Sequence, residues 1–413
     1  MVSRSLLGLV ALALCASAED RLRLEDLISE ALRRNPEVLG AQKRYEAARQ
    51  RPAQESSLPD PMLSLGYNSS GSPRPFAGLG REPTANAGVM ISQEFPFPGK
   101  RKLRGEIAAK EADADFQQYQ AVQLSVVSRV KQAYHRLRYA WTAREVLERN
   151  RDLLRKFLRT TEARYAVGKA QQQDVFKAQT QLSILETRLA KLTQERLSRE
   201  AELNGLLARP IDTPLAQPAD VAAAPLRVTL EDLLNQAREN APVLRREEKM
   251  VQRAELAVNL ARKEYYPDYT LSAGVYHMGA MPSMYMARVD FKLPAWFWHS
   301  QRAGVAEEVS SLSQARRSLE ATGQALAFRL KDDYLMAETS YRLMEIYSST
   351  VIPQSSLALQ ASLAAYETGG VDFLTVLANF TTMLDYELNY HEELQSYFLA
   401  LARLEEMTGM TLT

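Results

Sequence analysis

The sequence predicts a mainly α-helical chain that also carries a few short membrane β-strands. Three observations lead to this fold class. No proline interrupts the chain between Gly99 and Arg209, which suits very long helices. Several segments of about ten residues alternate apolar and polar side chains, as membrane strands do. The N-terminus carries the pattern of an export signal.

Composition narrows the class of protein. The chain has 413 residues, with 51 Lys+Arg against 50 Asp+Glu, so its formal charge is +1. A nearly neutral chain does not bind nucleic acid through bulk charge. With 46% apolar residues it is also too apolar to be disordered. A single Cys excludes an intrachain disulfide framework and a Cys-based zinc module.

The first 18 residues predict a cleaved signal peptide. Arg4 precedes an apolar run from Leu6 to Leu14, and a small-residue end follows at Ala18. The alternative is a lipoprotein anchored through Cys15, although Leu14 precedes that position, where such sites want a small residue. No later apolar run reaches the roughly 20 residues that a membrane helix needs. We therefore expect an exported protein that is either soluble or a β-barrel.

The chain is organised as a duplication. Leu24–Leu27 recurs as Leu230–Leu233, and Tyr165-x-x-Gly168 recurs as Tyr366-x-x-Gly369, in the same order and at similar offsets. We expect one repeat over 19–209 and a second over 229–413, with the proline-rich stretch 210–228 as the connector.

Each repeat is expected to hold short helices, two strands, a long helix, a glycine turn and a second long helix. The long helices are expected at 100–167, 172–208, 299–367 and 372–408. The first would run to roughly 100 Å, which suits a coiled coil. A heptad seam in the second supports this, because its apolar residues step alternately by three and four. These residues are Val175, Ala178, Leu182, Leu185, Leu189 and Leu192. Pro353 has no counterpart in the first repeat, so the two helical hairpins should bend differently.

Strands are expected at about 62–68, 87–95, 268–277 and 284–293. In the last of these, apolar residues alternate with Met286, Arg288, Asp290 and Lys292. Such alternation is typical of a barrel strand with a lipid face and a lumen face, and it would place Glu94 on the lumen face as well. Aromatic residues near the strand ends suit an interfacial girdle. A soluble sheet with one face packed on helices would show the same alternation.

Four strands cannot close a barrel, since about eight is the small end. Because unclosed strand edges do not exist in lipid, several chains would have to share one barrel. Three chains would supply twelve strands, an even number as bacterial barrels require.

The segment Ile91–Glu106, with its Phe-Pro-Gly-Lys-Arg run, resembles the strand-to-helix junction of outer-membrane efflux proteins, the TolC family. That run resembles the heavy-metal efflux branch in particular. Tyr165–Gly168 and Tyr366–Leu377 resemble the paired helix-tip turns of the family. The likeness covers nearly the whole chain after the signal segment.

The resemblance implies a homotrimer with a 12-stranded pore in outer-membrane lipid and a helical tunnel in the periplasm. It implies docking to a periplasmic adaptor at the tip residues Tyr165, Gly168, Tyr366, Gly369 and Gly370, and an inner-membrane pump of the resistance-nodulation-division type. The expected cargo is heavy-metal cations, with drugs or secreted polypeptides as the alternative. A soluble periplasmic coiled-coil adaptor or scaffold is the alternative of another class. Neither a cofactor nor nucleic acid is implied.

The family closes its tunnel with acidic residues near the helix tips. By the Tyr-x-x-Gly register those acids fall at Thr375 and Ala378, where this chain has none. Asp372 is the acid nearest the second turn, and Asp174 is its rough counterpart in the first repeat. We expect Asp372, Asp174 and Thr375 at the constriction, where a ring of Asp would favour cations. The alternatives are an N-cap for Asp372 and a first-turn helix-dipole role for Asp174.

A methionine group near the second hairpin is a weaker candidate metal site. Soft thioether ligands suit Cu(I), but hairpin tips also tolerate Met freely. Its members, which lie beside His277, are Met278, Met281, Met284 and Met286. His135, His299 and His391 are isolated and are expected to be surface or core residues. No enzyme motif appears in the sequence, so catalysis is not expected.

Overall fold

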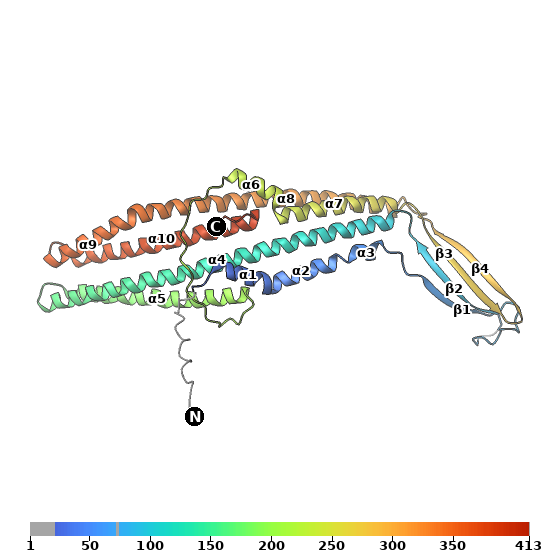
Figure 1. Cartoon of the computed structure of the whole chain (residues 1–413), viewed down its shortest axis with the longest axis horizontal. Helices are drawn as coiled ribbons and strands as arrows, with labels where there is room; N and C mark the ends of the chain where they lie inside the picture. Colours follow the sequence, from blue (N-terminus) through green and yellow to red (C-terminus); the bar gives the residue numbers. More distant parts are fainter. Residues whose placement is uncertain (1–20, 72–73, 413) are drawn as a thin grey trace, which may run out of the picture. The chain divides into compact units, whose positions relative to one another are not determined.

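The computed structural model describes residues 21–71 and 74–412. The expected signal segment, including Cys15, lies outside the described residues. The elements of the first half are α1 (Leu24–Arg34), α2 (Pro36–Ala48), α3 (Arg51–Ser56), β1 (Met62–Asn68), β2 (Asn86–Phe95), α4 (Lys100–Ala166) and α5 (Gln172–Leu206) (Figure 1). Those of the second half are α6 (Leu230–Asn240), α7 (Pro242–Lys263), β3 (Asp268–Met278), β4 (Met281–Lys292), α8 (Ser300–Ile346), the π-helix η1 (Tyr347–Val351), α9 (Ile352–Thr368) and α10 (Phe373–Thr408). The prediction of a mainly helical chain with four antiparallel strands is confirmed.

The described chain divides into two units. The tip unit comprises residues up to 39, 123–237 and those from 327 onward. The sheet unit comprises 40–122 and 238–326. Among the described residues, no helix combines the length and the apolar character needed to cross a membrane.

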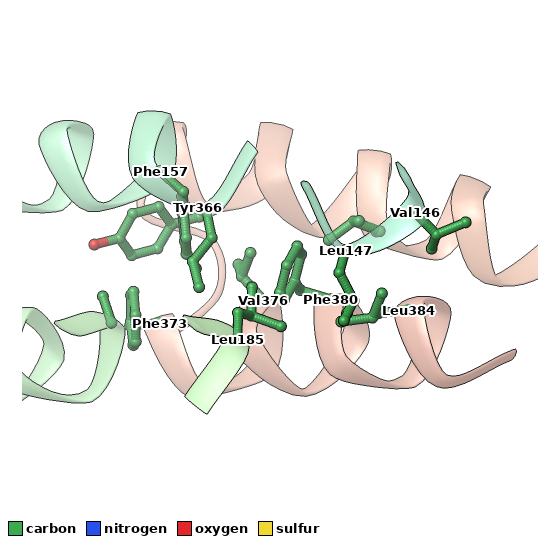
Figure 2. Packing of buried hydrophobic residues seen from close by; sticks show 12 residues of the cluster. Val146, Leu147, Phe157, Leu185, Tyr366, Phe373, Val376, Phe380 and Leu384 are labelled. Atoms are coloured by element: carbon green, nitrogen blue, oxygen red, sulfur yellow. The ribbon is translucent and has the colours of Figure 1, made fainter. Parts of the chain in front are cut away.

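The tip unit holds a coiled-coil core between its helical hairpins. The heptad seam of α5 contributes Ala178 and Leu185, both fully buried. Figure 2 shows Leu185 in one cluster with side chains of α4, α9 and α10, among them Leu147, Tyr366 and Val376. Phe157 stacks on Phe373 with ring centroids 5.2 Å apart and an interplanar angle of 4°. Each such fully buried apolar side chain contributes roughly 1.5–3 kcal/mol, so this seam holds the helix ends together.

The second hairpin is interrupted where the first is not. Helix α4 runs unbroken for 67 residues, whereas α8 ends at Ile346 and is followed by η1. Pro353 lies in the first turn of α9, which continues from η1 without a break in helical backbone, so its missing N–H removes a bond that a regular α-helix would make. The sequence analysis expected, from Pro353, that the two helical hairpins bend differently. The different bend itself stays a prediction, and a π-helix before the proline was not predicted.

The sheet of the sheet unit runs in the order β1-β2-β3-β4, and every pairing is antiparallel (Figure 1). Its central ladder joins β2 of the first half to β3 of the second, with Ile91 opposite Ala273. One expectation was wrong. Met278 and Met281 do not lie in a loop but are the paired last and first residues of β3 and β4. Gly279 has φ +69°, and this left-handed conformation permits a turn of only two residues.

Candidate functional site

The two helix-tip turns of the tip unit have the same backbone geometry. Gly168, after α4, has φ +70°, and Gly369, after α9, has φ +81°. Each glycine N–H donates to the carbonyl of the tyrosine three residues before it, Tyr165 or Tyr366, at 3.0 Å. A left-handed residue after the last helical turn is a common helix end, and glycine adopts it without a Cβ clash. The recurring Tyr-x-x-Gly pattern therefore encodes a helix stop.

The tyrosines of the two turns occupy different surroundings. Tyr366 is only 4% exposed, and its ring lies 5.5 Å from that of Phe157 and 6.2 Å from that of Phe373. Tyr165 is 46% exposed, and Val167 beside it is 67% exposed. The second turn is thus packed into the core, while the first presents an apolar surface.

Arg164 joins the two tips within the tip unit. Its Nη1 donates to the carbonyl oxygens of Tyr366 at 2.7 Å and of Glu367 at 2.9 Å. Its guanidinium also lies 4.6 Å from the centroid of the Tyr366 ring. The side chain therefore gives a second donor to the Tyr366 carbonyl, binds the Glu367 carbonyl at the end of α9, and adds a cation–π contact. The sequence analysis did not single out Arg164.

Asp372 caps α10. Its carboxylate accepts from the backbone N–H of Thr375 at 3.0 Å and from the Thr375 hydroxyl at 2.5 Å. These hydrogen bonds hold the pKa of the exposed Asp372 carboxyl below its ordinary value. Asp174 lies at the N3 position of α5 and forms a capping box with Gln171. Thr375 is thus a partner of the cap, and both acids have a structural role whatever they line.

The four strands separate apolar from polar residues as expected. On one face, Tyr285, Val289 and Phe291 of β4 are 79%, 52% and 61% exposed. Apolar exposure on this scale marks a surface that another phase or another protein covers.

The opposite face of the sheet carries the charged residues. Arg288 Nε lies 2.9 Å from Asp290 Oδ2. Glu94 and Asp290 fall in one cross-strand row with Thr270 between them, and Lys292 follows on the same face of β4. The predicted lumen residues Glu94, Arg288, Asp290 and Lys292 therefore share one face of the sheet.

The predicted methionine group is divided by the observed register. Met278 and Met281 pair beside the turn, while Met284 and Met286 lie farther along β4, opposite Tyr276 and Gly274. The described residues hold no group of three or more His, Cys, Asp or Glu side chains that could hold a metal ion. Any soft-metal site here would consist of thioethers.

A buried ion cluster fixes the junction between strands and helices in the sheet unit. Lys100, at the start of α4, is 1% exposed. Its Nζ lies 2.9 Å from Asp268 Oδ1 and 2.9 Å from Glu264 Oε2, and it donates to the Tyr266 carbonyl at 3.0 Å. Asp268 also accepts from the backbone N–H of Phe97 at 2.6 Å. The two chain segments that enter β3 and leave β2 are thereby joined.

Gly99 has φ +91°, which turns the chain from β2 into α4. A Cβ added there would lie 2.6 Å from Lys263 Nζ, so the space beside Gly99 is already filled. Phe97 stacks on Tyr266 at 4.5 Å between ring centroids. The Phe-Pro-Gly-Lys run therefore encodes a rigid corner: a stacked ring, a left-handed residue and a buried cation.

A family model described as "Outer membrane efflux protein" matches residues 27–209 and 233–410, which is most of the chain. The chain belongs to the outer membrane efflux protein family. The match falls in two segments, and each of them contains one of the strand pairs and one of the helix-tip turns described above.

Relatives of this outer membrane efflux protein agree with the fold. It is 20% identical over 388 residues to the cobalt-zinc-cadmium resistance protein CzcC of Cupriavidus metallidurans, covering 94% of this chain and 90% of the relative. The solved structure of CusC superposes with a TM-score of 0.80 at 17% identity, covering 94% of this chain and 92% of the other. That of VceC from Vibrio cholerae gives 0.79 at 18% identity, covering 94% and 97%.

The efflux protein also buries a basic stripe on α4 that the sequence analysis did not find as a group. Lys131, His135 and Arg138 are 6%, 2% and 6% exposed, and their spacing places them on one helix face. The His135 ring stacks on Phe398 at 4.4 Å, and burial holds the pKa of His135 well below its ordinary value. Burial lowers the pKa of His391 as well. The expectation of a core role holds for His135, which belongs to the packing of the tip unit.

Proposed function

We propose that this efflux protein is a passive trimeric conduit that carries heavy-metal cations across the outer membrane. The observation that carries the proposal is the four-stranded sheet. It has one exposed apolar face, and its outer strands β1 and β4 each pair on one side only. Strand edges in lipid must be paired, and four strands cannot close a cylinder. Three chains would pair β4 of one chain with β1 of the next and close a twelve-stranded barrel.

The helix tips supply the proposed docking surface for a periplasmic adaptor, which would connect the conduit to an inner-membrane pump of the resistance-nodulation-division type. Exposed apolar residues near the tips support this. Val167, Phe176 and Leu374 are 67%, 57% and 46% exposed. A protein–protein interface needs an apolar centre of this kind. Three copies of Asp372, one from each chain, would form a cation-favouring constriction near the helix tips, together with Asp174 and Thr375.

Metal cations are the proposed cargo because the matched relative CzcC is named for cobalt, zinc and cadmium resistance. The resemblance of the Phe-Pro-Gly-Lys-Arg run to the heavy-metal efflux branch supports the same assignment. Drugs or secreted polypeptides would pass through a conduit of the same architecture, so growth of cells lacking the gene is the discriminating assay. We expect greater sensitivity to Co²⁺, Zn²⁺ and Cd²⁺ with unchanged drug sensitivity and unchanged secretion. The reverse pattern would overturn the metal assignment.

The conduit itself is tested by purification from washed envelopes. We expect extraction only with detergent, a trimer band that shifts to the monomer position on heating, and discrete conductance steps in planar lipid bilayers. Release of a monomer into plain buffer would overturn the proposal in favour of a periplasmic coiled-coil scaffold. Substituting Val167→Asp should then abolish capture of the adaptor without changing conductance, whereas Leu197→Asp, an exposed apolar residue elsewhere on α5, should change neither.

A further inference from the structure

Methionine is concentrated in the sheet. The chain has 13 methionines, and six of them lie in the four strands, which have only 7, 10, 11 and 12 residues. Met62 and Met90 lie on β1 and β2, and Met284 and Met286 lie on β4. Met278 and Met281 form the pair beside the turn.

The register places the first four of these on the polar face. Met62 lies in one cross-strand row with Ser92, Ser272 and Arg288, and Met90 and Met286 lie in the row of Ser64 and Gly274. Met284 lies opposite Tyr276. Within the four strands, the apolar face carries Leu, Ile, Val, Phe and Tyr side chains instead. These are Leu63, Leu65, Tyr67, Val89, Ile91, Phe95, Tyr269, Leu271, Val275, Tyr285, Val289 and Phe291. Methionine that served only as apolar filling would be expected on that other face.

Met90 and Met286 lie on either side of a glycine on the polar face. They flank Gly274 on the neighbouring strands, so their Cα atoms are separated by two strand spacings, about 10 Å. Gly274 has no side chain of its own and is buried, and the Tyr276 ring covers it. A Cβ at this position would lie 3.2 Å from the Met90 Cβ and 3.0 Å from the Tyr276 ring.

Tyr276 completes the group. A Cβ added at Gly88, its partner on β2, would lie 2.3 Å from the Tyr276 ring, so this ring fills the space over both Gly88 and Gly274. Its hydroxyl contacts Met90 Sδ at 3.8 Å. A thioether sulfur and a ring therefore meet over the glycines, and Met284 and Met286 lie on the neighbouring strand β4.

We propose that Met90, Met284 and Met286 form a transient binding site for soft monovalent cations, Cu(I) or Ag(I), on the polar face of the sheet. This rests on the proposed function, because that face lines the pore only in the assembled barrel. Neutral thioethers select soft cations over Zn²⁺, Co²⁺ and Mg²⁺. The charged residue in the adjacent row, Arg288, pairs with Asp290 in the row beyond it, so its charge is largely offset. A neutral site with few ligands releases its ion readily, as a conduit requires.

The test uses the full-length trimer in detergent with Ag(I), which matches the charge and softness of Cu(I) without its redox chemistry. We expect silver binding in competition dialysis, sulfur ligands in silver X-ray absorption spectra, and no displacement by excess Zn²⁺. In the variant Met90→Leu/Met284→Leu/Met286→Leu, silver affinity should fall at least tenfold. Leu keeps the volume and apolar character of Met, and the control Met336→Leu, exposed on α8, should bind silver as the native chain does.

Three outcomes overturn the inference: native spectra with only nitrogen or oxygen ligands, unaltered affinity in the triple variant, or an equal loss in the control. The native spectra decide the matter even where the triple variant fails to assemble. Conductance separates this inference from the proposed function. Trimers that conduct but bind no silver would remove the methionine site and leave the conduit, whereas a chain that forms no pore would remove the conduit itself.

Discussion

Replacing Lys100 by Met should loosen the junction between strands and helices. The substitution keeps the aliphatic length of the side chain and removes its charge. Asp268, whose side chain is 12% exposed, then loses its cation and keeps the Phe97 N–H as a donor. The Glu264 side chain is 41% exposed, so water can solvate its carboxylate in the variant, and its lost ion pair adds little to the loss of stability. Breaking a buried ion pair costs about 3–5 kcal/mol, and the remaining donor and partial exposure bring our expectation to about 3 kcal/mol.

The measurement is the midpoint of urea unfolding in lipid vesicles, followed by the fluorescence of Trp296 and Trp298, which lie just after β4. Lys102→Met is the matched control, since its side chain is 80% exposed and its pair with Glu106 spans 3.7 Å, which is worth less than about 0.5 kcal/mol. The double variant Lys100→Met/Asp268→Asn should recover part of the loss, because it leaves no buried unpaired charge at position 268. Equal midpoints for the Lys100 and Lys102 variants would refute the reasoning.

Three further predictions concern the tip unit. Gly369→Ala should destabilise the tip unit by roughly 1–2 kcal/mol, because the backbone at Gly369 has φ +81° and the added Cβ would contact no atom within 4 Å. Gly370→Ala should be nearly neutral. Equal melting temperatures for the two variants would contradict this. Asp372→Ala should raise the conductance of the channel in planar bilayers and lower its preference for cations. Asp372→Asn keeps an oxygen that can cap α10, so it should lower the cation preference alone. Unchanged ion selectivity in both variants would remove Asp372 from the constriction. Burial lowers the pKa of His135 in the folded state, so the unfolded state binds more protons below about pH 6.5. The melting temperature should therefore fall as the pH is lowered from about 7.5 to 5.5, and His135→Phe should reduce that fall. Identical pH profiles for the native chain and the variant would exclude His135 as the cause.

The periodicity of the sequence predicted the features that depend on residues close together in the chain. The heptad residues Ala178 and Leu185 are buried as their spacing requires. The two glycine stops, Gly168 and Gly369, lie where the repeated Tyr-x-x-Gly pattern placed them. Strand alternation likewise indicated which residues share the polar face, because side chains on a strand alternate strictly between its two sides.

Contacts between distant segments were not predictable in the same way. Lys100 and Asp268 lie in different halves of the chain, and no periodicity links a lysine after one strand to an aspartate before another. The placement of Met90 beside Met286 depends on β2 pairing with β3, which a single sequence does not specify. The two-residue turn at Gly279 was missed because polar and small residues around it suited a longer loop equally well.

The π-helix at Tyr347–Val351 sets the phase of everything after it. An α-helix turns about 100° per residue, so a segment wound one residue more loosely rotates the following helix against the preceding one. Leu359 and Tyr366 face the tip core only with that offset in place. Because the looser turn takes up one extra residue, deleting a single residue between 347 and 351 would permit uniform α-helical winding and leave both side chains facing the core, whereas winding the full-length segment as α-helix would rotate both away by about 100°. In this stretch, the winding of the backbone decides which side chains of α9 enter the core.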